Sequence, residues 1–252
     1  LAGAGANTGG GGGLGAGGDI FIQQGGSLII EGSSALNQGN VAGGQGGTGS
    51  RGSHAQAGRA YGDAIFLQGN QSIVLAPSAG QDLSIGGVIA DMTGSADQTG
   101  QTGTSNVVVT GGGRVFLRAA NTFSGGVVIQ QGTLSLVGSP NGAGSGVISF
   151  ATGADGILAV TAGATAVPNE ISGFDAGDKL DFTNIGFAAG NNLGLKAALD
   201  DGNDILVLIN NDTIVPDDLV LKILASPISD RQVGAVGGLI YFAKGFEFEN
   251  QY

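Results

Sequence analysis

Short apolar runs separated by Gly-rich polar stretches dominate the first 190 residues of the chain. The runs are rich in Val, Ile, Leu and Phe, which is typical of β-strands. The three- and four-residue apolar spacing that predicts amphipathic helix is absent over these residues. The clearest runs are Asp19 to Ile22, Leu28 to Glu31, Ile65 to Leu67, Ile73 to Leu75, Val107 to Val109, Val115 to Leu117, Val127 to Ile129 and Ile157 to Val160.

The runs also repeat, which favours a stacked architecture. Gly18 to Gln23 is echoed by Gly62 to Gln68. Because one short coil cannot bury its apolar side alone, successive coils stack into a continuous core, with Gly in the turns. We therefore predict an all-β fold, a right-handed parallel β-helix with a C-terminal cap of strands and one short helix. A β-sandwich is the alternative, although it usually shows a cleaner apolar/polar alternation.

The texture of the chain predicts three parts. Residues 1–13 are expected to be a Gly-rich flexible segment. Residues 14–185 are expected to form the coils, with loop excursions at 39–61 and 92–106. Residues 186–252, where Asp replaces Gly in the turns, are expected to form terminal coils and a cap. Within this last part we predict a helix over 193–199, a hairpin over 204–215 and further strands near 219–224, 238–242 and 246–248.

Composition and charge exclude several classes of protein. Gly accounts for 52 of the 252 residues, yet 41% are hydrophobic, so the chain can bury a core. Gly does not recur at every third position along the chain, which excludes collagen. The net charge of −11 without clustered Lys or Arg excludes nucleic-acid binding. No apolar stretch is long enough for a transmembrane helix. The start at Leu1 without an initiator Met suggests a processed piece of a longer protein.

One segment resembles a known family. Residues 121–136, Asn-Thr-Phe-Ser-Gly-Gly-Val-Val-Ile-Gln-Gln-Gly-Thr-Leu-Ser-Leu, resemble the passenger-associated repeat of bacterial autotransporters. The Gly-Asp-Ile-Phe and Gly-Asp-Ala-Ile-Phe units resemble repeats of polymorphic outer-membrane passengers. Residues 171–182 resemble a segment of large exported adhesins. The resemblance implies a β-helix exported to a bacterial cell surface or secreted. No series of alternating segments typical of a translocator barrel follows.

Candidate chemistry is limited to a few polar clusters. His54, the only His, lies in a Gly-rich excursion, which is a poor place for a catalytic base. Asp175, Asp178, Asp200 and Asp204 lie beside predicted turns and are the candidate Ca²⁺ ligands. The alternative for these side chains is the capping of backbone N–H groups in turns. We predict no resident cofactor other than such a Ca²⁺.

These observations favour a structural or adhesive module of an exported bacterial surface protein, with no enzymatic activity. Its expected partners are a host or abiotic surface, a carbohydrate or a matrix, and copies of itself stacked end to end. A self-assembling filament subunit is one alternative. A polysaccharide-degrading β-helix is the other, since such enzymes use pairs of carboxylates. The long excursions at 39–61 and 92–106 are the expected contact regions.

Overall fold

The computed structural model describes residues 9–50, 54–95, 102–161, 167–182 and 187–200, together with residues 202, 206 and 208. The chain divides into two units, 1–206 and 207–252. The description below concerns the first unit. The hairpin predicted over 204–215 and the strands predicted after it lie outside the described residues.

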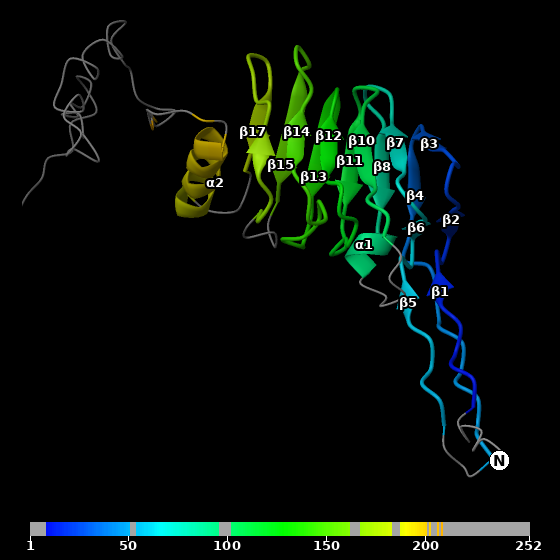
Figure 1. The fold of residues 1–252 in the computed structure, drawn as a ribbon. Helices are drawn as coiled ribbons and strands as arrows, with labels where there is room; N and C mark the ends of the chain where they lie inside the picture. Colours follow the sequence, from blue (N-terminus) through cyan, green and yellow to red (C-terminus); the bar gives the residue numbers. More distant parts are fainter. Residues whose placement is uncertain are drawn as a thin grey trace, which may run out of the picture. The chain divides into compact units, whose positions relative to one another are not determined.

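Strands from successive coils pair in parallel to form three sheets (Figure 1). The first sheet has six strands: β3 (Leu28–Glu31), β7 (Ser72–Ala76), β10 (Asn106–Val109), β12 (Val127–Ile129), β14 (Ile148–Phe150) and β16 (Ile171–Ser172). The second sheet also has six: β4 (Ser34–Leu36), β8 (Asp82–Ile85), β11 (Arg114–Leu117), β13 (Gly132–Leu136), β15 (Gly156–Val160) and β17 (Lys179–Asp181). The third sheet has three: β2 (Ile20–Ile22), β6 (Ile65–Leu67) and β9 (Ile89–Asp91).

The chain passes through the third, first and second sheets in turn up to β9, and from β10 on it alternates between the first two, so each strand pairs with the equivalent strand of the next coil. Val107 lies beside Ile73 on one side and Val127 on the other. The predicted parallel β-helix is therefore confirmed. The sequence echo is explained as well, because Phe21 stacks on Phe66 of the next coil with ring centroids 5.7 Å apart.

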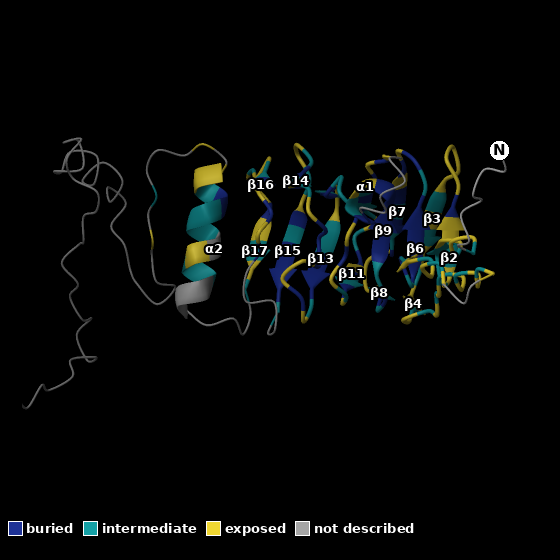
Figure 2. Ribbon diagram, turned by 60° about the horizontal axis from the view of Figure 1, so that its bottom comes forward, coloured by how far each residue is buried: buried dark blue, intermediate teal, exposed yellow. Residues whose placement is uncertain are grey.

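The core lies between the sheets and consists of alternate strand residues (Figure 2). Val107 and Val109 are fully buried, whereas Val108 between them is half-buried and points outward. The apolar runs of the first sheet are thus not buried on both sides, whereas Ile65 to Leu67 in the third sheet is buried at every residue. The middle residues of the first-sheet runs form an external row, in which Ile29, Val74, Val108 and Val128 lie next to one another on successive strands of the first sheet.

Residues 9–18, 39–50 and 54–62 form an arm of three hydrogen-bonded segments, where the sequence predicts a Gly-rich segment at 1–13 and a loop excursion at 39–61; residues 1–8 and 51–53 lie outside the described ones. The arm contains the short paired strands β1 (Gly15–Ala16) and β5 (Ala60–Tyr61) (Figure 1). The N–H groups that join its three segments recur every third residue. The hydrogen bonds run from Gly12 to Gln56, Gly15 to Arg59 and Gly18 to Gly62, from Gly44 to Gly13 and Gly47 to Gly10, and from Gly58 to Gly44 and Ala55 to Gly47.

A three-residue repeat is the signature of polyproline II-type segments, which make no hydrogen bonds within themselves. The order of the bonds shows that 9–18 and 54–62 run parallel to each other and that 39–50 runs antiparallel to both. Glycine is required where the segments meet. A Cβ at Gly12 would lie 1.9 Å from the Gly44 oxygen, and one at Gly58 would lie 1.9 Å from the Gly13 oxygen. The glycines of the arm therefore allow its three backbone segments to pack closely enough to form hydrogen bonds with one another.

The excursion at 92–106 begins with the short helix α1 (Met92–Ser95). The predicted helix over 193–199 is confirmed inside a longer one, α2 (Phe187–Asp200), which packs against β16. The Lys196 ammonium donates a hydrogen bond to the Asn169 carbonyl at 3.1 Å and so ties α2 to the last coil.

The arm can be tested with a matched pair of substitutions. In Gly12→Ala the new methyl group overlaps the Gly44 carbonyl, so we expect the three segments to separate. In Gly11→Ala the methyl group points into open space, so the arm is expected to stay intact. Hydrogen exchange of the amides of Gly44, Gly47 and Gly58 measures the outcome: we expect exchange about tenfold faster or more in Gly12→Ala alone. Equal exchange in the two variants would contradict the close packing.

Candidate interaction surface

A buried carboxylate holds the corner from which the candidate surface is built. Asp91 ends β9 and is fully buried. Its Oδ2 accepts hydrogen bonds from the N–H of Ser105 at 2.9 Å and from the N–H and hydroxyl of Ser124, both at 2.7 Å. Its Oδ1 accepts the N–H of Gly94 at 2.6 Å. Four donors offset the desolvation of a buried charge, which is otherwise costly. Asp91 thus joins its own strand, the α1 excursion and the next coil.

Asn121 also links neighbouring coils through buried side-chain hydrogen bonds. Its side-chain oxygen accepts the N–H of Ile89 at 2.7 Å in the coil before, and its amide donates to the Gly142 carbonyl at 2.6 Å in the coil after. Phe123, two residues on, is fully buried in the core. The first residues of the Asn121-to-Leu136 motif are therefore the ones that lock three consecutive coils together.

The outer faces of the two large sheets differ in charge. On the first sheet no charged residue occurs in β7, β10, β12 or β14. On the second sheet β8 and β11 carry an exposed ion pair, in which the Arg114 guanidinium donates to both carboxylate oxygens of Asp82 at 2.8 and 2.9 Å. This bond raises the already high pKa of Arg114. The first face is suited to neutral contacts and the second to polar ones.

Two arginines flank one aromatic ring on the second sheet. The guanidinium carbons of Arg114 and Arg118 lie 5.5 and 5.2 Å from the centre of the Phe116 ring, within the range of cation–π attraction. Arg118 also donates from Nε to the Ser84 hydroxyl at 2.9 Å. Neighbours on adjacent strands thus hold both guanidinium groups in place. We call Arg114, Phe116 and Arg118 the Arg–Phe–Arg patch.

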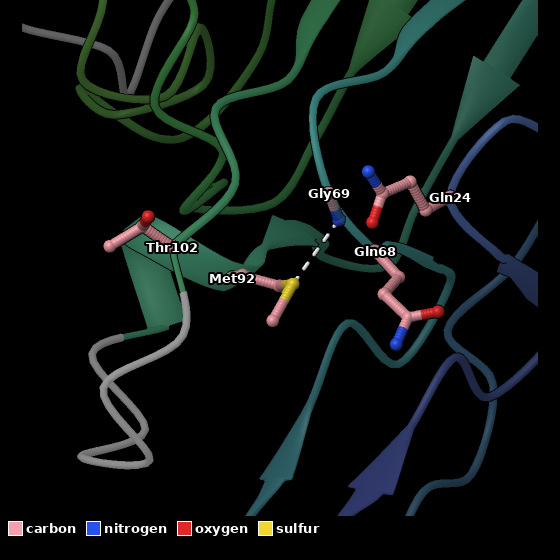
Figure 3. A pocket seen from close by; sticks show the side chains of 5 residues that line it. All are labelled: Gln24, Gln68, Gly69, Met92 and Thr102. Atoms are coloured by element: carbon pink, nitrogen blue, oxygen red, sulfur yellow. Dashed lines mark hydrogen bonds between the residues drawn. The ribbon is translucent and has the colours of Figure 1, made fainter.

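A hollow of about 390 Å³ lies at the corner between successive coils (Figure 3). Its lining residues carry no charge: Gln24, Gln68, Gly69, Met92 and Thr102. The Gly69 N–H points at the Met92 sulfur, 3.1 Å away. Beneath it, the Gln71 amide donates to the carbonyls of Gln23 and Gln68. The hollow is a polar surface feature without titratable groups.

Three of the four predicted Ca²⁺ ligands, Asp175, Asp178 and Asp200, accept hydrogen bonds from other groups of the chain. Asp178 Oδ1 accepts the N–H of Gly156 at 2.8 Å, and Asp175 Oδ2 accepts the N–H of Gly153 at 3.0 Å. These are turn-capping bonds to the coil before. Elsewhere, Asp200 accepts hydrogen bonds from Lys196 and, at 3.4 Å, from the N–H of Ile171.

The hydrogen bond from Lys196 lowers the pKa of Asp200. Asp204 lies outside the described residues. Within the described ranges, no three His, Cys, Asp or Glu side chains gather to hold a metal ion. His54 sits in the arm, where its Nδ1 lies 3.2 Å from the Thr48 hydroxyl.

Sequence reasoning missed both Asp91 and the Arg–Phe–Arg patch. Asp91 directly follows the apolar Val88-Ile89-Ala90 run, and that position gives only a weak signal. The patch gives a clearer signal in the sequence. Arg114, Phe116 and Arg118 are spaced two residues apart, and residues at this spacing in an extended segment point to the same side. The prediction that basic residues nowhere cluster therefore needs correction at this place.

Comparison with known proteins supports the repeat. A family model described as passenger-associated-transport-repeat matches residues 107–136, which span β10 to β13. No curated protein and no solved structure gives a significant match. The resemblance inferred from residues 121–136 is confirmed, and the chain carries an autotransporter passenger repeat. Among the described residues, no helix has the length and apolar character needed to cross a membrane.

The role of Asp91 can be tested by an isosteric change. In Asp91→Asn one side-chain oxygen becomes an NH₂ group, which faces a backbone donor such as Gly94 N–H and leaves it unpaired. We expect the free energy of unfolding to fall by about 1–3 kcal/mol. The control Asp82→Asn weakens only an exposed ion pair, for which we expect less than about 1 kcal/mol. Urea denaturation followed by circular dichroism measures both. A loss in Asp91→Asn no larger than in the control would contradict the role given to Asp91.

Proposed function

We propose that this chain is a rod-forming, adhesive module of a bacterial surface protein. The observation that carries the proposal is the passenger repeat at 107–136, whose four strands form the middle of an uninterrupted stack. Repeats of this kind belong to exported autotransporter passengers, which supports export to the cell surface. A stack of coils makes a stiff scaffold, and the outer faces of its sheets offer a long surface for contact.

The contacts of the carboxylates also support a structural role over polysaccharide cleavage. A glycosidase needs two carboxyl groups that face each other across a substrate. Here Asp91, Asp175 and Asp178 hold backbone N–H groups of neighbouring segments, and Asp82 pairs with Arg114. Each of these side chains is thereby engaged in stabilising the stack.

Surface location is the property that tests the proposal. Antibodies raised against the purified chain should label intact cells of the source bacterium, because an exported rod lies outside the outer membrane. A periplasmic marker protein, probed in parallel, should be labelled only after permeabilisation. If the chain too is labelled only after permeabilisation, the surface role is wrong.

A second candidate function, self-assembly into filaments, is favoured by the first coil. Within the described ranges, strands β2, β3 and β4 each lie at the edge of their sheet and pair on one side only. Ile29 on β3 is 61% exposed and Phe21 on β2 is 49% exposed. An edge with unpaired backbone groups and exposed apolar side chains is a template for pairing with another chain.

Electron microscopy of the purified protein tests this second candidate. Filament formation through the first coil predicts fibres for the native protein and dispersed short particles for Ile29→Lys, since a charge at an edge strand opposes pairing. The control is Val147→Lys, which places the same charge at a residue 38% exposed beside the interior strand β14. Dispersed particles for the native protein, or fibres in both variants, would contradict assembly through this edge.

A further inference from the structure

In the part of the chain that the structure describes, the Arg–Phe–Arg patch brings two arginines to one aromatic ring, although the chain has a net charge of −11. Its two guanidinium groups differ in what they can still bind. Arg114 is neutralised by its two hydrogen bonds to Asp82. Arg118 has no ion pair with any described carboxylate, and its bond to Ser84 uses only Nε. The terminal N–H groups of Arg118 are therefore available to a ligand.

The position of Arg118 is fixed before any ligand binds. The Ser84 hydroxyl holds one edge of the guanidinium, and the ring of Phe116 lies against it. The Arg118 backbone N–H donates to the Ile85 carbonyl at 3.0 Å, which anchors the residue to the coil before. A pre-positioned planar fork suits a carboxylate, because two parallel N–H···O bonds can form with little loss of side-chain freedom.

The surroundings of the patch favour an extended polymer. Arg118 lies on the open outer face of a sheet, so a ligand must run along the surface. The half-buried Thr133 pairs with Arg114 on the next strand and adds a hydroxyl to this face. Farther along the same row lie Ile157 and then Lys179, three strand spacings or about 14 Å from Arg114. Arg118 is four residues along the chain from Arg114, so Lys179 lies farther from it, at about 19 Å. Cations separated by uncharged residues match a chain that carries carboxylates at intervals.

We propose that the Arg–Phe–Arg patch binds the carboxylate groups of an acidic polysaccharide. Arg118 is the main contact on the protein and Lys179 is a second one. The proposal deepens the adhesive part of the proposed function by naming a partner class. Carboxylates of the protein oppose such a ligand. Asp82 is neutralised by Arg114, and Asp181 lies two residues from Lys179 on β17. At 0.15 M salt, however, charges beyond about 8 Å are largely screened, whereas a direct guanidinium–carboxylate contact persists.

Binding of the purified chain to immobilised polygalacturonate at 0.15 M salt tests the proposal. We expect measurable binding that weakens about tenfold or more in Arg118→Ala, the range for loss of a charge-assisted hydrogen-bonded contact. Arg118→Lys keeps the charge but not the fork, so an intermediate affinity is expected. The control Arg59→Ala removes an exposed arginine of the arm and should change the affinity less than twofold. Circular dichroism verifies that each variant is folded.

Three results would overturn the proposal. The first is no binding of the native chain to polygalacturonate, and the second is an equal loss in Arg118→Ala and Arg59→Ala. The third is equally tight binding to neutral dextran or to polyglutamate, which would show that the partner is not an acidic polysaccharide. Because the assay uses purified protein, failure here would leave the surface location to be decided by antibody labelling of intact cells.

Discussion

The stack depends on satisfying the backbone at the corners where the chain leaves one sheet for the next. Strand residues find partners in the coils before and after, but corner residues leave the ladder and still need partners for their N–H groups. Asp91 meets this need with a carboxylate that serves four donors. Asn121 accepts the N–H of Ile89 and donates to the Gly142 carbonyl. Gln71 serves carbonyls instead, donating to those of Gln23 and Gln68. Buried polar side chains at the corners thus set the register that the apolar core alone leaves open.

Glycine serves two different physical ends in this chain. In the coils it permits a left-handed backbone at corners, as at Gly126 with a φ of 79°. In the arm it permits contact between three backbones, because any Cβ at Gly12, Gly43 or Gly58 would lie within 2.0 Å of a carbonyl oxygen. The first use needs single glycines, whereas the second needs one at every third residue. In this chain, the glycines of the coils and of the arm therefore have structural roles, in tight turns and in close contacts between backbones.

How far the sequence predicts this fold depends on the range over which a pattern repeats. Strands, their stacking and the motif at 121–136 were predictable because similar residues recur from coil to coil. The arm was not predictable, because glycine also occurs at Gly10, Gly11 and Gly13, where no close contact requires it, and so the three-residue repeat is obscured. Asp91 was not, because its partners Ser105 and Ser124 lie 14 and 33 residues away and no local spacing marks them. The patch around Phe116 was visible as alternation on one strand.

The division between neutral and charged outer faces follows from the stacking itself. In a parallel stack, residues at equivalent positions become neighbours about 4.8 Å apart, so like charges in a row repel and opposite charges pair. The first sheet avoids the problem with Val74, Val108 and Val128 in one row. The second sheet pairs Asp82 with Arg114 on the next strand, and Thr133 and Ile157 separate that pair from Lys179. Arg118, which follows the end of β11 and lies outside this row, has no carboxylate partner among the described residues and is held by an aromatic ring and a hydroxyl. The side chains that hold the coils together therefore also keep the Arg118 guanidinium in a fixed position on the outer face of this sheet.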